Sequence, residues 1–374
     1  MTYIILFILL ITVEWLIFLL VGQKENGKVY LCGANAPGKR KKQKSLFCSL
    51  ICLEFVLFAG FRALNIGADI NTYLAALDHF KKMSMGEILS AARVYPYRYE
   101  WGYFLLIKLC AFLGLSSTAF LFVIAAIIYI PLFVFINRYS TDPFLSVLTY
   151  FAFGLFAYSL GIFRQMIAMS ICLGGIRYIE ERKIVKYLIV CALATLFHIT
   201  AIVMVLLYFV NLLKIKDRRW LFLAVVIAAE LILFFFSRRI IEWLIKIFPK
   251  YSNYIGSKYD IQGGSYLGLV YINVLLFFGL YFVVPRVGEK YLLSVKAIAL
   301  AAILQSCAYS MAIFGRIVCY YSVFALVLLP LIAECFAKET FITKTILSII
   351  LMELAYITLS GATAISPYSF IWSR

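Results

Sequence analysis

Long apolar segments recur from one end of this chain to the other, and they limit what it can fold into. Each run is about twenty residues long, which is the length that an α-helix needs to cross the hydrocarbon core of a bilayer. The sequence is 64% hydrophobic and only 14% charged, so a soluble fold could not cover its apolar side chains. We therefore expect an all-α, polytopic integral membrane protein, because a helix satisfies its own backbone hydrogen bonds inside lipid.

The apolar segments also predict how many helices the protein has. They indicate roughly 10–13 transmembrane or re-entrant helices in a single transmembrane domain that covers residues 1–374. Among them are single helices at about 143–160 and 317–335. Longer polar connections at 64–101 and 238–265 are predicted to be outer loops. The second begins with an amphipathic stretch, which we expect to lie on the membrane interface.

The basic residues predict which loops face the cytoplasm. A net charge of +17 would suggest nucleic acid binding in a soluble protein, but lysine and arginine collect in the cytoplasmic loops of membrane proteins. We therefore expect no nucleic acid partner. Residues 23–44 are rich in lysine and contain Glu25 as their single acid, which places this loop in the cytoplasm and the N-terminus outside. Loop 64–101 mixes both signs of charge and is expected outside.

Two stretches do not fit a simple alternation of crossings. Residues 101–115, with Lys108 in their middle, are predicted to be a re-entrant or interfacial helix, since two full crossings would put later basic loops on the wrong side. Residues 186–214 have basic residues at both ends, so we expect a re-entrant hairpin with His198 at its tip. The alternative is one long tilted helix with a buried histidine.

A polar cluster follows the second helix. The segment 60–73 leaves the membrane with Arg62, turns at Gly67, and at once presents Asp69 and Tyr73. A polar cluster at a membrane surface is a candidate site, and we take Tyr73 as one of its substrate-binding residues.

Three arginines fall at outer helix ends under this topology. Arg62, Arg164 and Arg316 lie at that level, and His198 approaches it. A charged residue costs roughly 2.5–3.5 kcal/mol at the centre of a membrane helix, so charges kept near lipid usually face a cavity or a partner. A single arginine could instead extend its side chain to the headgroups. Several guanidinium groups near one surface favour a phosphate-rich ligand, such as a lipid pyrophosphate, because each can hold two phosphate oxygens.

Three side chains on the same face are candidates for a general base: Asp69, Glu100 and His198. Asp69 could instead cap a helix that begins near Asn71, and Glu100 could simply pair with Arg98. The sequence contains no Walker, GxGxxG, HExxH or DxD motif. We therefore expect no metal and no cofactor, and a sugar donor that carries its own lipid anchor.

Six short motifs run in order through almost the whole chain: FRALNIGADINTY at 61–73, YEWGYFLL at 99–106, FRQMIA at 163–168, ERKIVKYL at 181–188, LFHITAIV at 196–203 and SPYSFIW at 366–372. Together they resemble the EpsG family of Wzy-like polysaccharide polymerases. That family is associated with exopolysaccharide, capsule or O-antigen synthesis, and it is similar to the GT-C class of glycosyltransferases.

The resemblance implies a multi-pass protein of the bacterial cytoplasmic (inner) membrane that joins undecaprenyl-pyrophosphate-linked oligosaccharide repeat units on the outer face. It also implies membrane lipids, a chain-length regulator and a flippase as partners. Carried over by motif, the functional positions of the family fall on Arg62, Asp69, Glu100, Arg164, Gln165 and His198, with Arg316 at a later arginine position. Ser369 stands where the terminal motif of the family has a basic residue, so we assign no role to the tail.

These expectations combine into one hypothesis, a metal-independent glycosyl transfer of the hexosyltransferase type. Arg62, Arg164 and Arg316 would hold the donor pyrophosphate, while one of the three candidate bases deprotonates the acceptor hydroxyl. Two other functions stay open. A flippase or exporter of the same lipid-linked sugar would also need a basic cavity, and a glycan ligase or acyltransferase would share the membrane setting.

Overall fold

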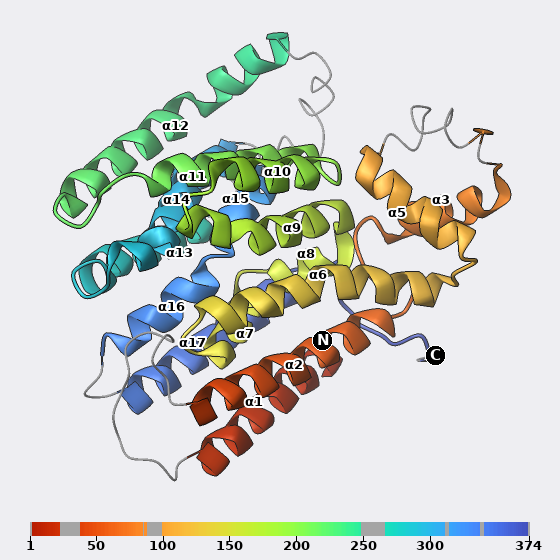
Figure 1. Cartoon of the computed structure of the whole chain (residues 1–374), viewed down its shortest axis with the longest axis horizontal. Helices are drawn as coiled ribbons and strands as arrows, with labels where there is room; N and C mark the ends of the chain where they lie inside the picture. The colour runs from red at the N-terminus through yellow and green to blue at the C-terminus, as the bar shows by residue number, and fades with distance from the viewer. Residues whose placement is uncertain are drawn as a thin grey trace. The chain divides into compact units, whose positions relative to one another are not determined.

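The computed structural model describes residues 2–22, 38–84, 86–87, 99–247, 266–310, 314–336 and 340–372 (Figure 1). Throughout these ranges the regular structure is helical, and the one extended pairing in them is an isolated antiparallel bridge between Arg62 and Phe370. The all-α expectation is confirmed.

Five helices in the described ranges are long and apolar enough to cross a membrane. These spans are Lys41–Gly60, Ser117–Tyr139, Arg219–Ile240, Tyr266–Val283 and Ile342–Ser360. The chain is therefore a multi-pass membrane protein. Five shorter apolar helices accompany them, and the predicted total of 10–13 requires that these also enter the membrane, which stays a prediction.

Two segments expected to be single helices are broken. Residues 143–160 form α7 (Pro143–Ala152) and α8 (Leu155–Gly161), which meet at 67°. Gly154 lies between them with a φ of +70°, a conformation that glycine adopts without strain. Residues 317–335 form α15 (Phe314–Ser322) and α16 (Ala325–Glu334), which meet at 46°. Each bent pair could make one further span.

The chain divides into two compact units, one comprising Met1–Ile202 with Glu339–Arg374 and the other Val203–Lys338. That both belong to a single transmembrane domain stays a prediction. The remaining helices of the first unit are α1 (Thr2–Gly22), α2 (Gly38–Gly60), α3 (Ile70–Lys82), α5 (Trp101–Phe112), α6 (Ser117–Tyr139), α9 (Phe163–Glu180), α10 (Ile184–Thr195) and α17 (Thr340–Ser360).

The first unit packs around α6. This helix lies between α2 and α9, while α10 packs on α9, and α17 packs on α7 (Figure 1). Phe55 of α2 is fully buried and contacts aromatic rings from α1, α6, α7 and α8. Such aromatic packing positions the end of α2, after which the candidate Arg62 follows.

Polar contacts tie together the helix ends that the topology places in the cytoplasm. The Lys44 ammonium donates to the Ser140 carbonyl. Asp142, which is 2% exposed, accepts from the Leu145 N–H at the start of α7 and pairs with Lys344 of α17 at 2.7 Å. Arg62 follows the C-terminal end of α2 and Arg164 lies at the N-terminal end of α9. The predicted topology places both of these ends away from the cytoplasm.

We expect the Asp142→Ala variant to be destabilised by about 2–3 kcal/mol, because it removes the ion pair with Lys344 and the cap at the start of α7. Thermal unfolding of the purified protein in detergent measures the change. The control is Asp78→Ala, whose pair with Lys81 is largely exposed and should contribute less than about 1 kcal/mol. Equal unfolding temperatures for the two variants would contradict the prediction.

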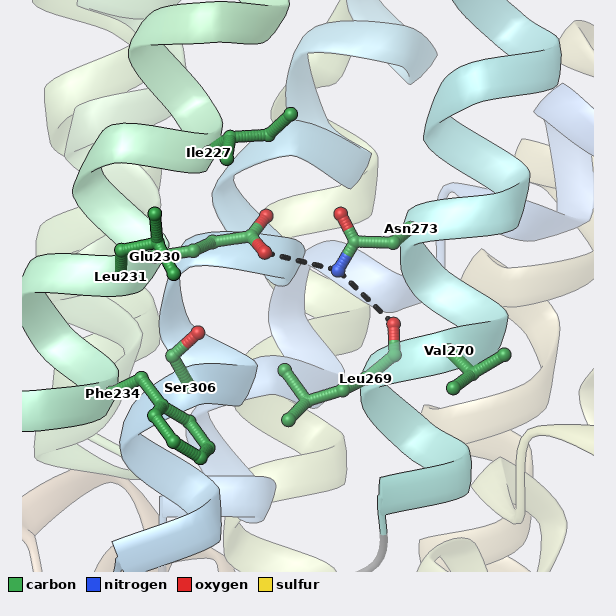
Figure 2. Close-up of a pocket in the computed structure, with 8 residues that line it drawn as sticks. All are labelled: Ile227, Glu230, Leu231, Phe234, Leu269, Val270, Asn273 and Ser306. Atoms are coloured by element: carbon green, nitrogen blue, oxygen red, sulfur yellow. Dashed lines mark hydrogen bonds between the residues drawn. The ribbon is translucent and has the colours of Figure 1, made fainter.

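The second unit contains α11 (Val205–Asn211), α12 (Arg219–Ile247), α13 (Tyr266–Phe278) and α14 (Leu293–Ser310), in addition to α15 and α16. A cavity of about 280 Å³ lies between α12, α13 and α14 (Figure 2). Its walls are mostly apolar, but Glu230 accepts a hydrogen bond from the Asn273 amide at 3.0 Å inside it. This bond joins α12 to α13, as polar residues inside membrane bundles commonly do.

The predicted outer loops contain more helix than expected. Loop 64–101 includes α3, and residues 88–98 lie outside the described part of the chain. Loop 238–265 was predicted to begin at 238, yet α12 continues to Ile247, supported by an i,i+4 pair between Arg238 and Glu242 at 2.8 Å. No proline or glycine occurs between residues 238 and 248, which accounts for the extension. Residues 248–265 are also outside the described part.

Candidate functional site

The segment between α2 and α3 closes against the end of α8. Gly67 has a φ of +127° there, and a Cβ on it would lie only 2.2 Å from the Leu160 carbonyl oxygen. A Cβ on Gly161 would similarly lie 2.8 Å from the Ala68 nitrogen. Only glycine allows two backbones to approach this closely. The approach brings the start of α3 beside the start of α9, so the first predicted polar motif meets the FRQ motif.

Arg164, in the first turn of α9, pairs with Glu100 at the N-terminus of α5. Its Nη1 lies 2.6 Å from Glu100 Oε2, and the two side chains are 26% and 21% exposed. The other carboxylate oxygen accepts from the Ile199 backbone N–H at 3.3 Å. Arg98, the alternative partner of Glu100, lies outside the described residues. Glu100 thus connects the arginine of one predicted motif to the turn that carries His198.

The His198 turn is held against α5 by the backbone. The Gly102 N–H donates to the Leu196 carbonyl at 2.7 Å, and a Cβ on Gly102 would meet the same oxygen at 2.9 Å. Because α10 ends at Thr195 and His198 lies beyond it, the alternative of one continuous tilted helix is wrong. That the two arms form a re-entrant hairpin in the membrane stays a prediction.

The hydrogen bonds of His198 assign its neutral tautomer. Its Nδ1 lies 2.6 Å from Thr200 Oγ1 and 3.3 Å from the Thr200 backbone nitrogen. A backbone N–H can only donate, so Nδ1 is the acceptor and the ring proton sits on Nε2. In this state Nε2 is a hydrogen-bond donor rather than a proton acceptor.

Tyrosines surround the Arg164–Glu100 pair. The Arg164 guanidinium lies 5.1 Å from the centre of the Tyr99 ring, and the Tyr73 hydroxyl is within hydrogen-bonding reach of it. Tyr103 contacts both of these tyrosines, with ring centres 5.3 Å from Tyr73 and 5.2 Å from Tyr99. We call these five residues the Arg164 cluster.

Arg62 has a different environment from the one predicted. It is only 2% exposed, and its guanidinium lies 5.2 Å from the centre of the Phe163 ring. In the described part of the chain its Nε and Nη2 have no hydrogen-bond partner. Burial lowers the pKa of Arg62 to about 10, so it still carries its charge at neutral pH. Arg62 is linked to the Arg164 cluster by Phe163, whose ring also stacks on Tyr73.

A family model described as the EpsG family matches residues 45–370, which is most of the chain. The protein belongs to the EpsG family. No curated protein and no solved structure matches it. The resemblance drawn from the six motifs is confirmed at the level of the family. The first five motifs contribute residues to the described site or to the helices beside it.

Other predicted site residues of this EpsG-family protein are placed less centrally. Asp69 occupies the N-cap position of α3, so the helix begins where the capping alternative expected it, but the half-buried Asp69 side chain makes no capping hydrogen bond. Gln165 is 3% exposed on α9. Arg316 is on α15, which belongs to the second unit, whereas the Arg164 cluster belongs to the first. Among the described residues, no group of three His, Cys, Asp or Glu side chains could hold a metal ion.

Sequence reasoning missed several residues of the site. Tyr99 and Tyr103 flank Glu100 in the YEWGY motif, and their spacing of four residues was a signal that went unused. Tyr103 is fully buried, and its hydroxyl is without a partner in the part of the chain that the structure describes. The C-terminal tail, to which no role was assigned, pairs with the backbone on both sides of Arg62. No local pattern would have indicated that pairing.

Proposed function

We propose that this EpsG-family protein is a polysaccharide polymerase, a glycosyltransferase that joins undecaprenyl-pyrophosphate-linked repeat units at the outer face of the bacterial cytoplasmic membrane. The observation that supports this most directly is Arg164, a partly buried guanidinium at the outer end of α9. One of its nitrogens is bound to Glu100, while its Nε has no partner among the described residues. A GT-C-like architecture and a partnership with a chain-length regulator are parts of the same proposal.

In this proposal Arg164 binds the pyrophosphate of the sugar donor. Glu100 holds the guanidinium from one side, which orients the fork and leaves Nε for a phosphate oxygen. The His198 Nε2–H is a second hydrogen-bond donor to the same pyrophosphate. As the bond between the anomeric carbon and the pyrophosphate oxygen breaks, the electron pair goes to the pyrophosphate, and these positioned donors stabilise the growing negative charge.

The general base is the second part of the proposal. Glu100 is engaged by Arg164, and His198 has its proton on Nε2, so neither is well prepared to accept a proton. Asp69 makes no capping bond and lies one turn before Tyr73, which belongs to the Arg164 cluster. We assign Asp69 as the general base that accepts the proton of the acceptor hydroxyl. The hydroxyl oxygen then forms the new bond to the anomeric carbon. The growing chain is the donor and the incoming repeat unit is the acceptor.

Purified protein in liposomes tests this function. The substrate is the lipid-linked repeat unit extracted from a strain that lacks the gene, supplied without nucleotide sugar. We expect a ladder of products on a gel, because a polymerase that uses a lipid donor needs no other sugar source. Active substrate and folded protein with no ladder would contradict the proposal, and transbilayer movement of the substrate in the same liposomes would then favour a flippase. A single transfer product would favour a ligase.

A further inference from the structure

The C-terminal tail of the protein is built into the end of α2. Three backbone hydrogen bonds of 2.9 Å hold it there: Gly67 N–H to Ala364, Ala63 N–H to Ser369, and Ile371 N–H to Phe61. The last two flank the antiparallel bridge between Arg62 and Phe370. The tail therefore pairs with the one segment of the chain that presents Arg62.

Tyr368 anchors this tail and caps α2. It is 2% exposed, its ring stacks on Phe58 with centres 4.4 Å apart, and its hydroxyl donates to the Phe58 carbonyl at 2.6 Å. In a continuing helix the Arg62 N–H would bond to that carbonyl, but Arg62 has left the helix. The last carbonyls of a helix need other partners, and the Tyr368 hydroxyl provides one.

Arg62 leads from this cap to the candidate site. Since α2 ends at Gly60, the Arg62 side chain turns inward, and its guanidinium lies over the Phe163 ring. Tyr368 is connected to Arg62 through the backbone, because the tail that it anchors bonds to the residues on both sides of Arg62. Phe163 immediately precedes Arg164, and its ring also stacks on Tyr73 with centres 4.8 Å apart. The contacts thus run from Tyr368 through Arg62 and Phe163 to the first turn of α9.

We propose that the C-terminal tail is a fixed part of the transfer site and that Tyr368 is a positioning residue, which acts through Arg62 and Phe163 on Arg164. Arg62 itself then holds a ring in place by its charge and is not the pyrophosphate ligand that its motif predicted. This inference rests on the proposed role of Arg164 as donor ligand. It adds a role for the tail, and it explains why a buried, charged guanidinium with two unpartnered nitrogens is kept beside the site.

Equilibrium binding of radiolabelled undecaprenyl pyrophosphate to the full-length protein in nanodiscs tests the inference. We expect Y368F, which keeps the ring stack but loses the hydroxyl, to bind about threefold more weakly, and Y368A about tenfold more weakly. The matched control is Y356A, since Tyr356 of α17 is 53% exposed, and it should bind like the native protein. Normal binding by both Tyr368 variants at equal folded amounts would overturn the inference.

A double-mutant cycle separates positioning from general destabilisation. If Tyr368 acts through Arg164, then Y368F combined with R164A should bind no more weakly than R164A alone. Independent, additive losses would overturn the inference. Failure of the proposed function would give a different result. R164A would then bind as tightly as the native protein, which would show that Arg164 does not bind the pyrophosphate and would overturn this inference with it.

A cross-link tests whether the tail is fixed. Ala63→Cys with Ser369→Cys places two thiols across the short antiparallel pair, on small residues that are both half-buried. Oxidation should leave binding and polymer formation unchanged, because the tail is already in its working position. Loss of activity that a reductant restores would overturn the inference, since it would show that the tail must separate from the segment after α2 during the reaction.

Discussion

Replacing Arg164 with alanine should abolish polymer formation without removing the protein from the membrane. Of the two predicted site arginines in the first unit, Arg164 is the one that is partly exposed, oriented by a carboxylate at 2.6 Å, and left with an unpartnered Nε in the described structure. Removing one such positioned donor typically lowers the rate about 10²–10³-fold. Arg164→Lys should recover only part of the activity, because an ammonium lacks the planar fork that holds Glu100 on one side and a phosphate oxygen on the other.

The measurement is the length distribution of polymer made in the liposome assay, at equal amounts of folded protein. Arg177→Ala is the matched control, because Arg177 lies on the same helix, in its last turn, and is exposed. That variant should make polymer of normal length. Full-length polymer from R164A, or equal losses in R164A and R177A, would show that Arg164 is not the donor ligand.

Gly67→Ala should have the largest effect on stability of any single methyl group added to the first unit. The φ of +127° at Gly67 is strained for any residue with a side chain, and the new Cβ would lie 2.2 Å from the Leu160 carbonyl oxygen. That oxygen belongs to the backbone of α8 and cannot rotate away, so the segment after α2 would have to shift. We expect a loss of about 3 kcal/mol or more in unfolding free energy.

Gly174→Ala is the control for this substitution. Gly174 is an exposed residue within α9, and a Cβ there would meet nothing within 4 Å. Alanine favours a helix over glycine by about 0.5–1 kcal/mol, so this variant should be at least as stable as the native protein. Thermal unfolding in detergent compares the two. A native unfolding temperature for G67A would mean that the segment 61–69 does not pack on α8 as described.

Much of the protein could be predicted one segment at a time. The first and last apolar segments of the sequence form α1, Thr2–Gly22, and α17, Thr340–Ser360, each as one helix of membrane-spanning length. Hydrophobic length is a local property, because a helix in lipid needs only its own residues to satisfy its backbone. The break before His198 was also predictable, because the segment 186–214 has basic residues at both ends.

The partners of the site residues could not be predicted in this way. Glu100 and Arg164 are 64 positions apart, and nothing near either one indicates the other. Arg62 was expected at an outer helix end as a ligand of the donor pyrophosphate, yet its side chain is only 2% exposed. Its burial results from α9 on one side and the tail on the other, and Tyr368 reaches Phe58 across 310 positions.

The sequence by itself determined the membrane class, the family, and the helix ends at which the candidate residues lie. The tertiary structure alone decided that Arg164 is oriented by Glu100, that the turn carrying His198 is held against α5, and that the tail caps α2 beside Arg62. The physical reason is that apolar length and charge bias act within one helix, whereas an ion pair or a buried ring depends on which helices pack together. That packing brings distant residues together and is not written in any single segment.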